Sequence, residues 1–81
     1  MRVHVIAFAR ARELLGAGEL NLEIAESSTL TTLRERLQRE APRLGQLGTS
    51  LRLARNGTLA ADSEPLRDGD EVALLPPVSG G

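Results

Sequence analysis

The sequence predicts an α+β fold in which a mixed sheet of about five strands packs on one main helix. Two segments with the alternation of strands come first, one segment with helical periodicity follows, and three shorter strand patterns complete the chain. The 81 residues contain no repeat, low-complexity tract or interior linker, so we expect one folded domain. We place this domain at residues 1–76 and a flexible Gly-Gly tail at residues 77–81.

The first two predicted strands cover residues 2–9 and 19–26. "RVHVIAFA" carries apolar side chains on both parities, which is typical of a strand in the middle of a sheet. "ELNLEIAE" alternates apolar and polar residues, which is typical of a half-buried strand, and we expect it to form a hairpin with the first strand. The segment between them, residues 10–18, is predicted to be a loop with room for one helical turn.

The main helix follows the second strand. Its apolar stripe consists of Leu30, Leu33, Leu37, Ala41 and Leu44. Thr29 is a natural N-cap, but Thr32 with Glu35 forms a competing capping box, so two starts about one turn apart are possible. Pro42 offers no N–H to the helix and therefore ends it near Glu40 or Ala41.

The rest of the chain predicts three short strands. Two of them flank Asn56-Gly57, which is a strong signal for a tight turn. The last covers residues 71–76, and Pro76 and Pro77 release the chain from the sheet because they donate no ladder hydrogen bond. One helix cannot bury its apolar side alone, and the sheet has one apolar face to cover, so we expect the sheet to wrap over the helix. This arrangement is the β-grasp, or ubiquitin-like, fold.

The composition argues against several classes of function. The net charge is -1, all ten basic residues are Arg, and Phe8 is the only aromatic residue, which argues against nucleic-acid binding. The chain has no cysteine, so it has no disulfide and no thiolate that could bind metal or carry sulfur. No run of about 18 apolar residues exists and the amino end lacks a signal-peptide cleavage site, so we expect a cytoplasmic protein without a membrane span.

No group of side chains within the domain has the pattern of a catalytic or metal site. His4 has no Cys and no clustered Asp or Glu beside it, so we expect a structural or surface role. The "GAG" at residues 16–18 is too short for a phosphate loop. Asp68 and Asp70 flank Gly69 in a manner typical of a turn. We therefore expect no metal site and no bound cofactor.

The parities of the first and last strands predict an apolar patch. If these strands are neighbours, Ile6, Phe8 and Leu75 share the face that the helix does not cover, with Arg12 at the rim. An exposed apolar patch of this kind usually marks an interface. The alternative is a sheet covered on both faces, in which these side chains belong to the core.

The last residues, Gly80 and Gly81, follow a rigid Pro76-Pro77 step. Glycine has no side chain, so such an end can enter a slot that is too narrow for other residues. The working group is then the terminal carboxylate of Gly81, which must be activated, most simply as an acyl-adenylate, before it accepts a nucleophile. A terminal Gly-Gly alone is more often a frayed end, and only its combination with the strand order and the apolar patch favours the functional interpretation.

Three segments resemble the ubiquitin-like sulfur-carrier family that includes the small subunit of molybdopterin synthase. "DGDEVALLPPVSGG" is similar to the C-terminal signature of that family, "FARARELLG" to its amino-terminal segment, and "LARNGTLA" to its middle strand pair. The likeness covers nearly the whole chain. The related thiamin-pathway carrier also ends in Gly-Gly, but it tends to be shorter and usually lacks the "LLPPV" approach.

The resemblance implies a non-catalytic carrier subunit. A ubiquitin-activating-type adenylyltransferase would adenylate Gly81 with ATP, and a sulfur donor would convert it to a thiocarboxylate. The tail would then enter the large synthase subunit, where the sulfur attacks cyclic pyranopterin monophosphate in molybdenum cofactor biosynthesis. The synthase is typically a heterotetramer. The implied contacts with the large subunit are Phe8, Arg12, Leu75, Pro76, Pro77 and Val78, next to the reacting end at Gly80 and Gly81.

Three other functions stay open. The chain could be a sulfur carrier for thiamin or another pathway, or a ubiquitin-like modifier whose Gly81 is joined to lysines of target proteins. It could also be a plain binding module in which the glycines are incidental. The absence of lysine excludes lysine-linked chains built on this protein, but not its attachment as a single tag.

Overall fold

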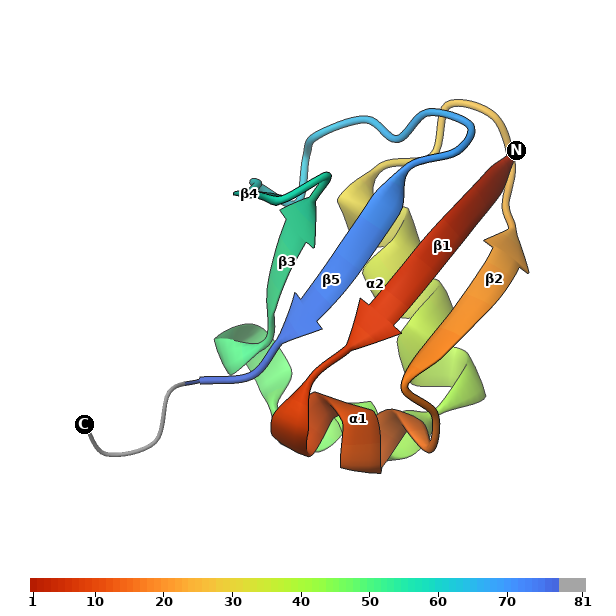
Figure 1. Cartoon of the computed structure of the whole chain (residues 1–81). Helices are drawn as coiled ribbons and strands as arrows, with labels where there is room; N and C mark the ends of the chain where they lie inside the picture. The colour runs from red at the N-terminus through yellow and green to blue at the C-terminus, as the bar shows by residue number, and fades with distance from the viewer. Residues whose placement is uncertain (78–81) are drawn as a thin grey trace.

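Strand β1 (Arg2–Ala7) is an interior strand of one five-stranded mixed sheet and not an edge strand, as its apolar side chains on both parities predict (Figure 1). The other strands are β2 (Glu19–Glu23), β3 (Arg52–Arg55), β4 (Thr58–Leu59) and β5 (Glu71–Leu75). Their order across the sheet is β2-β1-β5-β3-β4 in the computed structural model, which describes residues 1–77. β1 and β5 run parallel, and the other neighbouring pairs are antiparallel.

Helix α2 (Leu30–Glu40) covers one face of this sheet, and it ends where the sequence predicts (Figure 1). Thr29 is its N-cap: Oγ1 of Thr29 accepts from the N–H of Thr32 at 3.4 Å, and the N–H of Thr29 donates to Oγ1 of Thr32 at 3.4 Å. The capping box therefore joins Thr29 to Thr32 rather than Thr32 to Glu35. Of the two predicted starts, the earlier one is confirmed.

The core lies between the sheet and α2. Side chains of β1 and β5 that point toward the helix are fully buried, as is the leucine stripe of the helix itself. This set comprises Val3, Val5, Val72, Leu74, Leu30, Leu33 and Leu37. Burial of each such side chain contributes about 1.5–3 kcal/mol, which is enough to hold one helix on the sheet. The predicted α+β class, with a mixed five-stranded sheet on one main helix, is confirmed.

A second helix, α1 (Ala9–Leu15), replaces most of the predicted loop. It buries Ala11 and Leu14, which are three residues apart and therefore point to the same side. Gly16 ends the helix with a φ of 83° and donates its N–H to the carbonyl of Arg12 at 3.0 Å. A helix of seven residues is marginal by itself, so it depends on these two buried contacts.

The strands are shorter than the sequence predicts. β1 ends at Ala7 because Phe8 is the N-cap of α1 and Ala9 has a positive φ of 47°. β2 ends at Glu23, before the predicted end at residue 26. β5 ends at Leu75, one position before the first proline. The predicted pairing of β1 with β2 is confirmed, although α1 separates them and the connection is not a tight hairpin turn.

Short helices and tight turns connect the remaining strands. Residues 42–50, predicted as a loop, hold two 3-10 helices, η1 (Pro42–Gln46) and η2 (Gly48–Ser50). Asn56 and Gly57 have φ values of 50° and 88°, as a two-residue hairpin turn requires, so the predicted turn is confirmed. Over residues 1–77, no helix is long and apolar enough to cross a membrane.

Candidate partner-binding surface

Four apolar side chains form a row across the sheet face that α2 does not cover. Ile6 pairs with Ala73, Ala73 with Ala54, and Ala54 with Leu59, so the row crosses β1, β5, β3 and β4. Side chains alternate along a strand, and the neighbouring Val5, Leu74 and Leu53 are buried in the core, so these four point away from α2. We call Ile6, Ala73, Ala54 and Leu59 the outer row. Its last member, Leu59, is 55% exposed.

Phe8 and Leu75 lie at the end of the sheet next to the outer row. The N–H of Phe8 donates to the carbonyl of Leu74 at 3.3 Å, which holds Phe8 beside the end of β5, and its side chain is 47% exposed. Leu75 is half-buried and lies opposite Arg52. The first and last strands are neighbours, so the condition on which the predicted apolar patch depends is met. Phe8, however, belongs to the start of α1 and not to β1.

A groove runs beside the segment that leaves the sheet. Its volume is about 490 Å³, and it is lined by Leu59, Leu75, Pro76, Pro77, Thr49 and Ser50 among others. The outer row and the proline step therefore meet at Leu59. Leu59 was not predicted from the sequence, because a strand of two residues is too short to show an alternation of apolar and polar residues. Val78, Gly80 and Gly81 lie outside the described residues.

Arg12 lies on the exposed side of α1. Its guanidinium makes no hydrogen bond or ion pair with any of residues 1–77. It lies next to Gly18, whose carbonyl accepts from the N–H of Ala7 at 2.8 Å where β1 ends. The structure thus places Arg12 at the end of the β1–β2 pair, close to Ile6, which pairs with Glu19. This position is consistent with the predicted rim.

The opposite end of β5 holds a network of polar groups, which we call the polar cluster. The carboxylate of Asp70, which is 6% exposed, accepts from Nε of Arg55 at 2.6 Å, from Nδ2 of Asn56 at 2.9 Å and from the N–H of Arg67 at 2.8 Å. Arg55 also donates to Glu64 at 3.1 Å. Burial raises the pKa of Asp70, but these hydrogen bonds outweigh it and hold the pKa below the usual value of 3.8.

The side chains of Asp68 and His4 also have structural roles. Oδ1 of Asp68 accepts from the N–H of Arg2 at 2.7 Å, so the predicted turn is tied to the start of β1. Nδ1 of His4 lies 2.9 Å from Oδ1 of Asn21, and Nε2 lies 3.1 Å from Oε2 of Glu19. The hydrogen bond with Asn21, and then that with Glu19, raise the pKa of His4, while burial opposes them. Within residues 1–77, no cluster of His, Cys, Asp or Glu could hold a metal ion.

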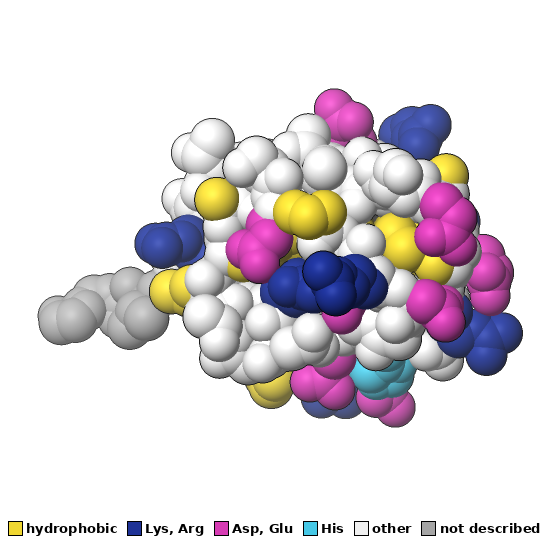
Figure 2. All heavy atoms as spheres, turned by 90° about the horizontal axis from the view of Figure 1, so that it is seen from above, with side chains coloured by type: hydrophobic (Ala, Val, Ile, Leu, Met, Phe, Trp, Pro, Cys, Tyr) yellow, Lys and Arg dark blue, Asp and Glu magenta, His cyan; other side chains and the backbone are white. Residues whose placement is uncertain are grey.

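Figure 2 views the molecule from the end at which β5 begins, and it shows acidic and basic side chains mixed together. Apolar atoms form only small separate spots on this face. A surface of mixed charge produces no extended field of one sign. The larger apolar features of the described chain, Phe8 and Leu59, are the two exposed large hydrophobic side chains.

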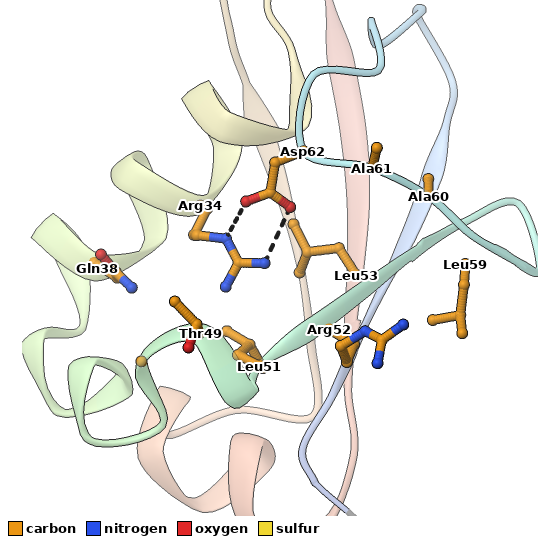
Figure 3. A pocket seen from close by; sticks show the side chains of 11 residues that line it. Arg34, Gln38, Thr49, Leu51, Arg52, Leu53, Leu59, Ala60, Ala61 and Asp62 are labelled. Carbon is orange, nitrogen blue, oxygen red and sulfur yellow. Dashed lines mark hydrogen bonds and ion pairs between the residues drawn. The ribbon is translucent and has the colours of Figure 1, made fainter.

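A larger cavity of about 640 Å³ lies between α2, η2 and β3 (Figure 3). On its wall, Nε and Nη2 of Arg34 donate to the two carboxylate oxygens of Asp62 at 2.8 Å and 3.1 Å. This pair ties α2 to the segment that follows β4. Nη1 of Arg34 is buried and has no hydrogen-bond partner among the described residues, so solvent in the cavity does not reach it. The ion pair, and not the cavity, ties α2 to the segment around Asp62, and Nη1 is the one donor of Arg34 that it leaves without a partner among the described residues.

Comparison with known proteins agrees with this architecture. The ThiS family matches residues 5–81. The molybdopterin synthase sulfur carrier subunit of Escherichia coli (strain K12) is 38% identical over 81 residues, with 98% of this chain and 99% of that protein covered. The protein of the same name from Arabidopsis thaliana is 36% identical over 81 residues, covering 100% of this chain and 84% of its own.

Two solved structures extend the comparison. SAMP1 from Haloferax volcanii has a TM-score of 0.89 and 28% identity, with both chains covered over 100% of their length. A chain from the protein–protein complex of subunits 1 and 2 of molybdopterin-converting factor from Helicobacter pylori 26695 has a TM-score of 0.74 and 30% identity, again with 100% of both chains covered. The sequence match over residues 5–81, with relatives similar over nearly their whole length, shows that this chain belongs to the ThiS family and is related to the molybdopterin synthase sulfur carrier subunits.

Proposed function

We propose that this chain is the sulfur carrier subunit of a molybdopterin synthase and that the carboxylate of Gly81 carries the sulfur. The observation with the most weight is the position of the outer row, which meets the departing segment Leu75–Pro77 at Leu59. One partner can therefore cover the row and receive the tail in the same contact. The names of the relatives from E. coli and A. thaliana support this assignment.

The chemistry requires a change at Gly81 before sulfur transfer. An adenylyltransferase of the ubiquitin-activating type joins the carboxylate to AMP from ATP and releases pyrophosphate. A sulfur donor then displaces AMP and leaves a thiocarboxylate, which is an anionic, soft nucleophile at neutral pH. Its sulfur attacks cyclic pyranopterin monophosphate and joins the pterin to Gly81 through a thioester. Water then cleaves the bond between sulfur and the carbonyl carbon of Gly81, which leaves the sulfur on the pterin and restores the carboxylate, and two such deliveries complete the dithiolene. This chain binds no cofactor of its own, and ATP is used by the activating enzyme.

The partner in sulfur transfer is the large subunit of the synthase. The complex of subunits 1 and 2 from H. pylori supports this partner, because its fold matches over the whole chain. Phe8, Leu75 and the outer row provide the apolar contact, since large exposed apolar side chains gain most from burial in an interface. Arg12 binds at the rim. Pro76, Pro77 and Val78 direct the tail into the pocket of the large subunit, which positions the sulfur and supplies the charge stabilisation. The assembly is a heterotetramer with a carrier at each end of a large-subunit dimer.

Protein modification is the second candidate, and the similarity to SAMP1 favours it. The solved structures include SAMP1 from H. volcanii and a small archaeal modifier protein 1 from Methanosarcina acetivorans, the latter with a TM-score of 0.81 and 30% identity. In this function an amine of a target lysine, and not sulfur, displaces AMP from Gly81 and forms an isopeptide bond. Both functions share the adenylate, and they differ in the nucleophile that follows. A thiamin-pathway carrier uses the same sulfur chemistry for another acceptor.

Intact-protein mass spectrometry of the chain from its native host distinguishes these functions. A sulfur carrier gains the mass difference between one sulfur and one oxygen, and thiocarboxylate-specific alkylation labels Gly81. A modifier instead produces covalent adducts with other proteins. Failure to find either product while molybdenum cofactor synthesis proceeds would contradict chemistry at Gly81.

Two variants of the tail test the position of the reacting carbon. We expect deletion of Gly81, or addition of one residue after it, to abolish sulfur delivery to the large subunit. The melting temperature should not change, because the described core lies within residues 3–74. The readout is dithiolene formation from cyclic pyranopterin monophosphate in the reconstituted synthase. Full activity in either variant would exclude terminal chemistry.

A further inference from the structure

Gly18 lies directly against the guanidinium of Arg12. An alanine Cβ at position 18 would lie 3.1 Å from Cζ, 3.2 Å from Nε and 3.4 Å from Nη2 of Arg12. Because three atoms of the planar group are at nearly equal distances, the face of the guanidinium, and not one end of it, lies over Gly18. Favourable contacts between carbon atoms are at about 3.5–4.0 Å, so a methyl group here would displace Arg12.

Gly16 and Gly18 are glycines for different physical reasons. Gly16 has a φ of 83°, which L-residues rarely adopt, and an added Cβ would meet no atom within 4 Å. Gly18 has no positive φ, so its backbone accepts an alanine. Its carbonyl accepts from the N–H of Ala7 at 2.8 Å, which fixes its position at the end of β1. The contact with Arg12 is thus the constraint that the described structure places on the side chain at position 18.

The Arg12 guanidinium is placed by Gly18 but has no partner of opposite charge within residues 1–77. The two acidic residues nearest to it in the sequence are engaged elsewhere. Glu13 pairs with Arg10 at 2.8 Å, and Glu19 pairs with His4 at 3.1 Å. The donor edges of Arg12 are therefore available to a second molecule, while one face of the group rests on the main chain.

We propose that Gly18 is a positioning residue for partner binding, and that it holds Arg12 flat so that the guanidinium donates a paired hydrogen bond to a carboxylate of the large subunit. A guanidinium matches a carboxylate in a two-point geometry, and an arginine that is already oriented loses less rotational freedom on binding. This inference rests on the proposed function, because it requires the large subunit to contact Arg12. The inference adds Gly18 to the residues that favour partner binding, through its effect on Arg12 and not through a contact of its own with the partner.

The test is a double-mutant cycle of Gly18→Ala and Arg12→Ala, measured by calorimetric titration of the whole carrier with its large subunit. We expect each single variant to weaken binding on the order of tenfold, as loss of a hydrogen bond to a charged group does, and the double variant to be no weaker than Arg12→Ala. The melting temperature of Gly18→Ala should be unchanged or higher, since alanine restricts the unfolded chain. Gly45→Ala is the matched control, because Gly45 has no positive φ and an added Cβ there meets no atom within 4 Å. It should bind like the parent protein.

A second measurement separates this inference from the proposed function. In the free carrier, nuclear Overhauser contacts should join the Arg12 side chain to the Hα atoms of Gly18, and the contact to Hα of residue 18 should weaken in Gly18→Ala. Absence of these contacts in the parent protein would overturn the role of Gly18, whatever the chain's function. If Arg12→Ala weakens binding and Gly18→Ala does not, the inference is wrong while the proposed function stands. If Gly18→Ala weakens binding further in the Arg12→Ala background, the added methyl group obstructs the partner directly and the positioning role is excluded.

Discussion

The two ends of strand β5 differ in their contacts: polar side chains at the start are hydrogen-bonded within the chain, and apolar side chains at the end stay partly exposed. At its start, the carboxylate of Asp70 accepts three hydrogen bonds, from Arg55, Asn56 and the main chain of Arg67. At its end, Leu75 leads into a proline step beside a groove of about 490 Å³. In Figure 1, β5 begins near the top of the view and its arrow points toward the lower left.

This difference indicates that the start of β5 fixes the strand in the sheet, while its end is available to a binding partner. Buried hydrogen bonds to a carboxylate are strongly directional, so Asp70 determines where β5 begins relative to β3. The exposed side chains of Phe8, beside the end of β5, and of Leu59, which lines the same groove as Leu75, contribute little to the core and can be buried by a partner. A rigid start thus allows an incompletely buried end, because the whole strand keeps its place in the sheet.

The largest expected effect concerns the polar cluster. Asp70→Ala should lower the free energy of unfolding by about 2–3 kcal/mol, because it leaves Nε of Arg55 and the N–H of Arg67 without their acceptor. Chemical denaturation measures this change. The folded fraction of Asp70→Ala should bind the large subunit as tightly as the parent protein does.

A matched control for this variant is Glu13→Ala. Glu13 is 65% exposed and pairs with Arg10 on the surface, so its loss should change the free energy of unfolding by less than about 0.5 kcal/mol. If both variants lose equally little stability, the polar cluster does not fix β5 and the contrast between the ends of the strand fails.

The order of the strands and the main helix along the chain, the Thr29 cap and the Asn56-Gly57 turn were predictable because each depends on a local pattern. The sequence left open whether β1 and β5 are neighbours, and their parallel pairing came from the structure. The division into residues 1–76 and a tail stays a prediction, since residues 78–81 lie outside the described structure.

Other features depend on contacts between distant segments. Helix α1 forms because Ala11 and Leu14 reach the core. Its seven residues are too few for the apolar periodicity that predicts a helix from sequence. The pairing of Arg55 with Asp70 depends on the register of β3 against β5. Leu59 joins the outer row through two ladders, one of which contains only a two-residue strand. Sequence patterns do not specify such register, so these parts of the site required the structure.

The next largest effect concerns the open end of the strand. Phe8→Ala should weaken binding to the large subunit by about tenfold or more, since large apolar anchors dominate interface energies. Its free energy of unfolding should fall by less than about 1 kcal/mol, because the Phe8 side chain is already 47% exposed. Titration with the large subunit and denaturation measure the two quantities.

Leu20→Ala is the opposite control for Phe8. Leu20 is half-buried and packs against the core, so its truncation should cost stability and leave binding unchanged. Severe unfolding of Phe8→Ala would instead place Phe8 in the core, and the two ends of β5 would no longer differ in their function.

A smaller effect is expected on how the free energy of unfolding depends on pH under acidic conditions. Because the pKa of Asp70 in the folded state lies below its usual value of 3.8, its contribution is present above that value and is lost as the pH falls through the folded-state pKa. Asp70→Asn removes this contribution at every pH. The difference in stability between the parent protein and Asp70→Asn should therefore shrink as the pH falls below about 4. A constant difference down to pH 2 would show that Asp70 does not titrate as the hydrogen bonds require.

The smallest expected effect belongs to His4, which lies on the outer face beside the start of β5. It is one side chain before Ile6 on that face, and it lies opposite Glu71 on β5. Hydrogen bonds from both ring nitrogens to Asn21 and Glu19 require the protonated ring, so the pKa of His4 is raised above 6.5. The resulting stabilisation is fully present below the unfolded pKa and is lost as the pH rises through the folded pKa. An NMR titration should give a midpoint above 6.5 for the parent protein and a lower one for Glu19→Gln. An unchanged midpoint in Glu19→Gln would mean that Glu19 is not committed to His4, and it would then be available to neutralise the nearby Arg12 at the open end of the sheet.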